Sequence, residues 1–223
     1  MGGAELPTPP GVSERTPHAP HPSPRRTGHA DPPHGTGDGV TTAQRSRTDE
    51  LRPVDPELFR TLLRRQASTV TVVTAVARGT RPACLGDVGA PLRAGFTATS
   101  FTSVSLDPPL VSFCLGATSS SSPVLDRAEH VAVHLLAANQ TEAARIFAAK
   151  GVDRFAAYPY WEAGPFGLPL LTGVLARLLC RVVHRVPAGD HSLVIAEPLA
   201  LAEGVDGAPL LHHRGGYTTA AAA

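Results

Sequence analysis

The chain has 223 residues, a formal net charge of +1 and 42% hydrophobic residues. A near-neutral charge excludes a strong electrostatic attraction to nucleic acid or to an anionic membrane, and no apolar stretch approaches the ~18 residues of a membrane span. The cysteines Cys84, Cys114 and Cys180 are widely spaced, with no CxxC or Cys/His ligand spacing. We therefore expect no structural zinc site, and we expect the reducing cytoplasm as the location.

Residues 1–50 differ in composition from the rest of the chain. They are rich in Pro, Gly, His, Ser, Thr and Arg and hold almost no large aliphatic residues. Such a segment cannot bury enough apolar surface to offset its chain entropy, so we predict that it is disordered and dispensable for folding. Residues 51–218 remain for one domain with a single core, followed by a short tail over 219–223.

The first predicted elements are a helix and a strand. Asp55 followed by Pro56 and Glu57 is typical of a helix start, with Asp as the N-cap and Pro at the first helical position. One helical face then carries the apolar residues Leu58, Phe59, Leu62 and Leu63. The β-branched run 69–76 predicts a strand, and the Gly- and Pro-containing residues 78–91 predict a long hairpin loop.

The next segment, 95–105, is the most informative one because it is crowded with short hydroxyl side chains. These are Thr97, Thr99, Ser100, Thr102, Ser103 and Ser105. Small hydroxyl residues leave backbone N–H groups accessible and add donors of their own, as a ligand with phosphate or ribityl oxygens requires. Taken alone, the run is equally typical of an exposed turn.

A second hydroxyl-rich loop lies close by in the sequence. After the rigid corner 107–109 comes a continuous apolar run, 110–115, and then the small polar residues 116–122. The apolar run predicts a buried strand. Two hydroxyl-rich loops at the ends of one buried strand can converge on one ligand.

The rest of the chain predicts a mainly β domain. We expect short helices over 123–127 and 139–149, the latter capped by Asn139, a strand over 130–136, and a loop-rich excursion over 151–169. Three strands, 173–185, 191–202 and 209–212, follow. Many short strands with few helices favour an antiparallel barrel over a parallel nucleotide-binding sheet, and no GxGxxG fingerprint opens a helix.

Several motifs in order resemble one known family. They are GFTATSFTSVSLDPPLVSFCL from Gly95, HVAVHLLAANQTEAARIFA from His130, DRF from Asp153, FGLPLL from Phe166, GDH from Gly189 and PLLHHRGGY from Pro209. The chain is similar over about residues 55–218 to the flavin reductase domain family. This resemblance implies an FMN-binding split β-barrel, antiparallel and Greek-key-like, with a few peripheral helices.

The resemblance also implies which residues form the site. Thr97, Ala98, Thr99 and Ser100 would contact the flavin ring and ribityl chain, Ser103 and Ser105 would lie nearby, and Ser119 and Ser121 would hold the phosphate. His191, as the catalytic residue, and Arg214 and Tyr217 would form the nicotinamide side. Family members often carry Arg or Thr where this chain has a run of serines, so Arg93, Arg154 or an arginine of a second subunit could neutralise the phosphate.

The implied activity is an NAD(P)H-dependent flavin reductase. Such an enzyme would use NADH or NADPH to reduce FMN or FAD, would pass the reduced flavin to an oxygenase, and would form a homodimer. Three alternatives remain: a flavoprotein of the same fold that keeps its flavin and acts on a small molecule itself, a split-barrel protein that binds flavin without turnover, and a plain β-barrel module that binds no flavin.

Overall fold

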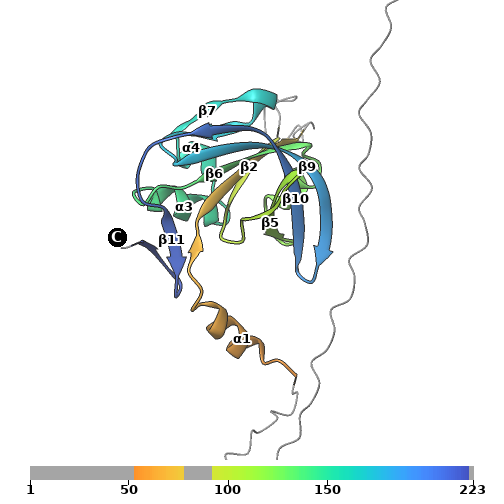
Figure 1. Ribbon diagram of the computed structural model, residues 1–223, viewed down its shortest axis with the longest axis vertical. Helices are drawn as coiled ribbons and strands as arrows, with labels where there is room; N and C mark the ends of the chain where they lie inside the picture. The colour runs from red at the N-terminus through yellow and green to blue at the C-terminus, as the bar shows by residue number, and fades with distance from the viewer. Residues whose placement is uncertain (1–52, 78–91, 221–223) are drawn as a thin grey trace, which may run out of the picture. The chain divides into compact units, whose positions relative to one another are not determined.

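The computed structural model describes residues 53–77 and 92–220. The predicted disorder of residues 1–50, the predicted hairpin loop over 78–91 and Cys84 lie outside the described residues. Within the described part, the chain is mostly antiparallel strand with a few short helices, which confirms the predicted fold class (Figure 1).

One seven-stranded sheet forms the body of the domain. Its strands lie in the order β3 (Leu92–Ala98), β2 (Thr71–Ala77), β6 (His130–Leu135), β9 (Ala176–Ala188), β10 (His191–Glu203), β5 (Pro109–Gly116) and β4 (Thr102–Leu106). Two smaller sheets complete the fold. One pairs β1 (Ser68–Thr69), β11 (Leu210–His213) and β12 (Gly216–Thr219), and the other pairs β7 (Trp161–Ala163) with β8 (Pro169–Leu171).

The large sheet curls until its two ends meet. Phe96 of β3, the first strand in the order, packs on Phe113 of β5, the sixth strand, with ring centroids 6.0 Å apart. One buried cluster fills the interior with side chains from β2, β3, β5, β6, β9 and β10. No ladder joins β3 to β4 or β5 among the described strands, so the barrel has a seam there.

Helices cover the outer face of β3. The helix α3 (Thr141–Ala148) lies on this face, and its Phe147 contacts the backbone of Gly95 so closely that a Cβ there would stand 2.6 Å from the ring. The short helix α4 (Arg154–Ala157) adds Phe155, whose ring packs edge-on against Phe147 at 5.5 Å. Gly95 is therefore required by close approach of a helix side chain to the strand.

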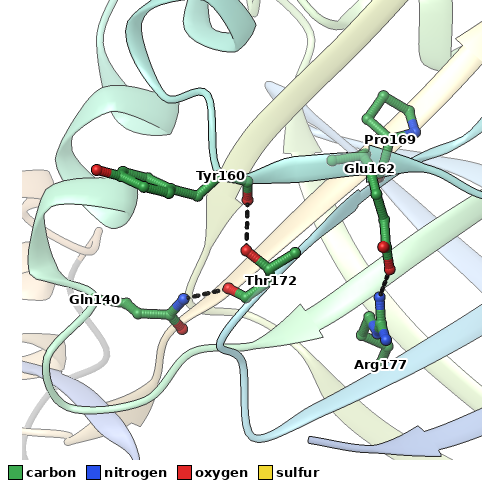
Figure 2. A network of polar contacts seen from close by, with 7 residues as sticks. Gln140, Tyr160, Glu162, Pro169, Thr172 and Arg177 are labelled. Carbon is green, nitrogen blue, oxygen red and sulfur yellow. Dashed lines mark hydrogen bonds and ion pairs between the residues drawn. The ribbon is translucent and has the colours of Figure 1, made fainter.

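The excursion between α4 and β9 is fastened by polar contacts (Figure 2). The Nε2 group of Gln140 donates to the Thr172 carbonyl oxygen at 2.9 Å, and Thr172 Oγ1 donates to the Tyr160 carbonyl oxygen at 3.3 Å. Arg177 of β9 pairs with Glu162 of β7 at 2.7 Å. The predicted loop thus contains α4, the β7–β8 hairpin and a 3-10 turn over Pro165–Gly167.

Three local predictions differ from the structure. The helix predicted from Asn139 begins at Thr141 after an N-cap at Gln140, whose side chain bonds Ala137 and Thr172 instead of capping the helix. Part of the hydroxyl-rich run is the edge strand β4, which pairs only with β5. The helix α2 is a single turn over Ser122–Leu125.

The first helix, α1 (Pro56–Leu63), begins as predicted, but its apolar face is half exposed. The side chain of Asp55 accepts from the Glu57 N–H at 3.0 Å, with Pro56 at the first helical position. The apolar residues of the helix are half exposed: Leu58 56%, Phe59 54%, Leu62 50% and Leu63 51%. No helix within 53–77 and 92–220 combines the length and apolarity needed to cross a bilayer.

Candidate functional site

A cavity of about 410 Å³ lies in the seam of the barrel. Residues 96–98 of β3 form one wall and residues 114–116 of β5 the other. We call it the seam cavity. Six residues predicted from the sequence line it: Thr97, Ala98, Thr99, Ser100, Ser119 and His191. Its size is that of a typical small-molecule or cofactor site.

Ser100 determines where the ladder between β4 and β5 ends. Its Oγ accepts a hydrogen bond from the Cys114 N–H at 2.8 Å, in the place of a backbone carbonyl oxygen. The last paired residues of the ladder are Thr102 and Ser112. Beyond that point the two strands separate and the cavity opens.

The floor of the seam cavity is apolar and its rim is hydroxyl-rich. Phe96, Leu115 and Phe147 line it from inside the barrel and from α3. Thr99 and Ser100 are exposed at the rim, whereas Thr97 Oγ1 donates to the Ala144 carbonyl oxygen at 2.7 Å. A flat ring can therefore rest on carbon while its polar edge meets hydroxyl and amide groups.

The second hydroxyl loop closes one end of the cavity. Ser119 and Ser120 line it, but Ser121 is buried, with 1% of its surface exposed. Ser121 Oγ donates to the Gly95 carbonyl oxygen at 3.1 Å and so joins the loop to β3. The hydroxyl hydrogen of Ser121 is thus already bonded within the protein. The direct phosphate contact of Ser121 stays a prediction.

Arg154 fixes this loop from α4. Its Nη1 donates to Ser121 Oγ at 3.3 Å and its Nη2 to Ser120 Oγ at 3.1 Å. Its Nε and Nη2 both donate to the Ala149 carbonyl oxygen, at 3.2 and 2.6 Å. Partial burial lowers the pKa of Arg154 from its usual value.

His191 also lines the cavity, and it lies where β10 begins. The turn before it uses Gly189 at φ +63, a left-handed conformation that suits glycine. His191 Nδ1 lies 2.7 Å from Asp190 Oδ1, and this hydrogen bond lowers the pKa of the Asp190 carboxyl. His191 pairs in register with Gly116, and its Nε2 would stand 3.7 Å from a Cβ there.

Five predicted site residues lie outside the lining of the seam cavity. Ser103 and Ser105 are on the edge strand β4, and Ser121 is buried behind the loop. Arg214 occupies the β11–β12 turn at φ +51, and its N–H donates to the Arg64 carbonyl oxygen at 3.0 Å. Tyr217 packs against His212 at 5.7 Å, and burial raises the pKa of its hydroxyl.

The structure adds residues that the sequence reasoning missed. Lys150, the only lysine in the chain, lines the seam cavity beside Arg154. Cys114 lies in the run 110–115 that predicts a buried strand, yet it is only partly buried and lines the cavity, because alternation along β5 turns Phe113 inward and Cys114 outward. Cys180 is fully buried, and burial raises the pKa of its thiol to about 12.

The charges at the cavity have one sign. Lys150 and Arg154 line it, and no Asp or Glu of the described residues does. Arg93, another candidate for the phosphate charge, instead lies over the Trp161 ring at 5.0 Å from the ring centroid. Among the described residues, no three His, Cys, Asp or Glu side chains gather as a metal site would require.

Comparison with known proteins identifies a family and several relatives that this chain resembles. Residues 63–221 match the family model described as "Flavin reductase like domain". The NADH:FMN oxidoreductase of Rhodococcus qingshengii is 42% identical over 163 residues, which cover 71% of this chain and 79% of that protein. The reductase subunit HsaB of a flavin-dependent monooxygenase of Rhodococcus jostii is 34% identical over 183 residues, with 82% and 83% covered.

A solved structure agrees with the fold. The NADH:FAD oxidoreductase SgcE6 of Streptomyces globisporus C-1027 superposes with a TM-score of 0.64 at 30% sequence identity. The match covers 78% of this chain and 94% of that one. Proteins similar to this chain therefore include reductases named for FMN and for FAD.

Proposed function

The chain belongs to the flavin reductase-like domain family, and from this premise we propose that it is an NADH-dependent flavin reductase. The observation that carries the proposal is the seam cavity, with its carbon floor, hydroxyl rim and wholly cationic charge among the described lining residues. This combination fits a flat redox ring that carries a phosphate. A plain barrel module would not need all three features in one place.

In this proposal, different residues of the cavity contact different parts of the flavin. Phe96 and Leu115 support the ring, and Thr99 and Ser100 offer hydroxyl and amide groups to its polar edge. Ser119, Ser120 and the positive charge at this end of the cavity receive the phosphate. When bound between these residues, a flavin would supply the redox chemistry as the acceptor of hydride from NADH.

The protein's part in the reaction is mainly to align the two cofactors. Hydride transfer requires the donor and acceptor atoms to lie about 3–3.5 Å apart, so stacking geometry matters more than a side-chain acid. His191 lines the cavity, with Nδ1 held by Asp190, which leaves Nε2 for the nicotinamide. His191 is thus the proposed nicotinamide contact.

We further propose a homodimer that uses the apolar face of α1. Four apolar side chains, each half exposed on one short helix, would be covered by a second copy. Arg214 and Tyr217, together with Ser103 and Ser105 on the edge strand, would then act across the subunit contact, since they lie outside the cavity of their own chain. Replacing Phe59 with Glu should convert the dimer to monomer in light scattering.

An oxygenase is the proposed recipient of the reduced flavin. The relative HsaB is named as the reductase subunit of a flavin-dependent monooxygenase, and we infer the same division of labour here. We place the reaction in the cytoplasm, where NADH is available and the free thiols Cys114 and Cys180 stay reduced.

The deciding experiment is NADH oxidation with and without added flavin. We expect little absorbance loss at the NADH band without flavin, and rapid loss with added FMN or FAD. Gel filtration of the loaded protein should release the flavin. Flavin that stays bound would support the flavoprotein that acts on its own substrate, flavin binding without NADH oxidation would support a carrier, and no binding would refute the proposal.

A further inference from the structure

The two cations of the seam cavity are not equivalent. Arg154 and Lys150 both line its serine-loop end, four residues apart in the chain. Arg154 is partly buried and bonded on three sides by protein oxygens, whereas Lys150 is exposed. No ion pair of Lys150 occurs within the part of the chain that the structure describes.

The hydrogen bonds of Arg154 leave it little to offer a ligand. A guanidinium has five N–H groups. In Arg154, four of the five N–H groups donate to the Ala149 carbonyl oxygen, Ser120 Oγ and Ser121 Oγ. One hydrogen, on Nη1, is left. The two parallel donors of a bidentate phosphate contact are therefore not available without breaking the loop apart.

Arg154 instead directs the serine hydroxyls. Because Ser120 Oγ accepts from Arg154, its own hydrogen is directed elsewhere, and Ser120 lines the cavity. Ser121 receives from Arg154 and passes its hydrogen to the Gly95 carbonyl oxygen. Lys150 has three ammonium N–H groups on a flexible stem and can meet a phosphate that rests on this loop.

We propose that Lys150 is the direct cation for the flavin phosphate, that Arg154 is a positioning residue, and that the site thereby selects FMN over both riboflavin and FAD. This inference rests on the proposed function. The terminal phosphate of FMN is a monoester with a second pKa near 6, so its charge at neutral pH is close to −2. Riboflavin has no phosphate, and each phosphate of FAD has one ester bond and one anhydride bond and carries a single charge.

The charge of the cavity explains why FMN should be preferred over riboflavin and FAD. FMN concentrates both charges on one phosphate group beside these cations, whereas FAD spreads two charges over two phosphates and riboflavin has none, so a lining with no described carboxylate favours FMN. The adenylate of FAD would also have to pass the serine loop, which Arg154 joins to Ala149 and Ser121 joins to β3. We therefore expect FMN to bind at least about tenfold more tightly than riboflavin or FAD.

The test is equilibrium binding of riboflavin, FMN and FAD to the full chain, followed by quenching of flavin fluorescence. In the Lys150→Gln variant, FMN affinity should fall about tenfold while riboflavin affinity stays unchanged, since only FMN presents a phosphate. Lys150→Arg should restore most of the FMN affinity. Arg127→Gln is the matched control, because it removes one exposed positive charge that lines a separate hollow beside Val76.

Three results would overturn the inference. They are equal loss of riboflavin and FMN affinity in Lys150→Gln, equal loss of FMN affinity in the Arg127 control, and wild-type binding of FAD as tight as that of FMN. The reductase proposal survives all three if NADH still reduces the bound flavins. It fails separately if none of the three flavins is bound or reduced.

Discussion

Acid should destabilise this barrel through one buried histidine, His134. Its ring is fully buried on β6, with Nδ1 2.9 Å from the Val72 carbonyl oxygen and no partner for Nε2 among the described residues. Burial lowers the pKa of His134 from 6.5 to about 4, because a charged ring would lose its hydration; the Val72 hydrogen bond opposes this shift and the charge of Arg177 adds to it.

The direction of the pH effect follows from which state binds the proton first. As pH falls, the unfolded chain protonates His134 near pH 6.5, whereas the folded chain does so only near pH 4. The stability that the neutral ring contributes is therefore complete above pH 6.5 and is lost as pH falls through this window. Each pH unit is worth ~1.4 kcal/mol, so ~2 kcal/mol of the unfolding free energy should be lost by pH 5.

Urea unfolding near pH 7.5 and near pH 5 measures this loss. The His134→Asn variant keeps a side-chain N–H near the Val72 carbonyl oxygen but does not titrate in this range, and His134→Gln repeats the test with a longer side chain. Wild type should lose ~2 kcal/mol more than either variant between the two pH values. Equal losses in wild type and variants would refute the argument, because other titrating groups are common to all three.

Three further predictions concern the seam. Gly95→Ala places a Cβ 2.6 Å from the Phe147 ring, so the free energy of unfolding should fall by about 1–3 kcal/mol in thermal unfolding. A second substitution, Phe147→Leu, should recover part of this loss, and an unchanged melting temperature in Gly95→Ala would contradict the packing. Ser100→Ala leaves the Cys114 N–H without its acceptor and should lower the free energy of unfolding by roughly 1 kcal/mol. The bulkier Ser100→Leu should in addition block flavin binding, which titration with flavin measures. His191→Ala should lower the reduction rate or raise the Michaelis constant for NADH in stopped-flow measurements and leave the flavin dissociation constant unchanged; wild-type kinetics would remove His191 from the nicotinamide side.

The barrel could be predicted from the sequence because its signals are local. Alternating and apolar runs mark strands at the right places, and the Asp55 cap with Pro56 marks the helix start correctly. Asn139 shows the limit of local reasoning. It has a cap residue's chemistry, yet the buried Gln140 takes the N-cap position, because its amide joins Ala137 to the distant Thr172.

The cavity was predicted only in part, because it is formed by strands that do not pair. Residues 97–100 stand out through their hydroxyls, and six predicted residues do line the cavity. Lys150 and Cys114 carry no local signal, since one follows an alanine-rich helix and the other lies within an apolar run. The role of Ser121 is likewise a tertiary property, set by its bond to the Gly95 carbonyl oxygen.

The bond from the Cys114 N–H to Ser100 also protects the open seam. A strand that extends beyond its partner normally presents bare N–H and C=O groups, which can recruit a strand from another molecule and begin aggregation. Here a side-chain oxygen covers the Cys114 amide at the mouth of the cavity. The barrel can therefore remain open to a small ligand while this amide offers no free donor to a foreign strand.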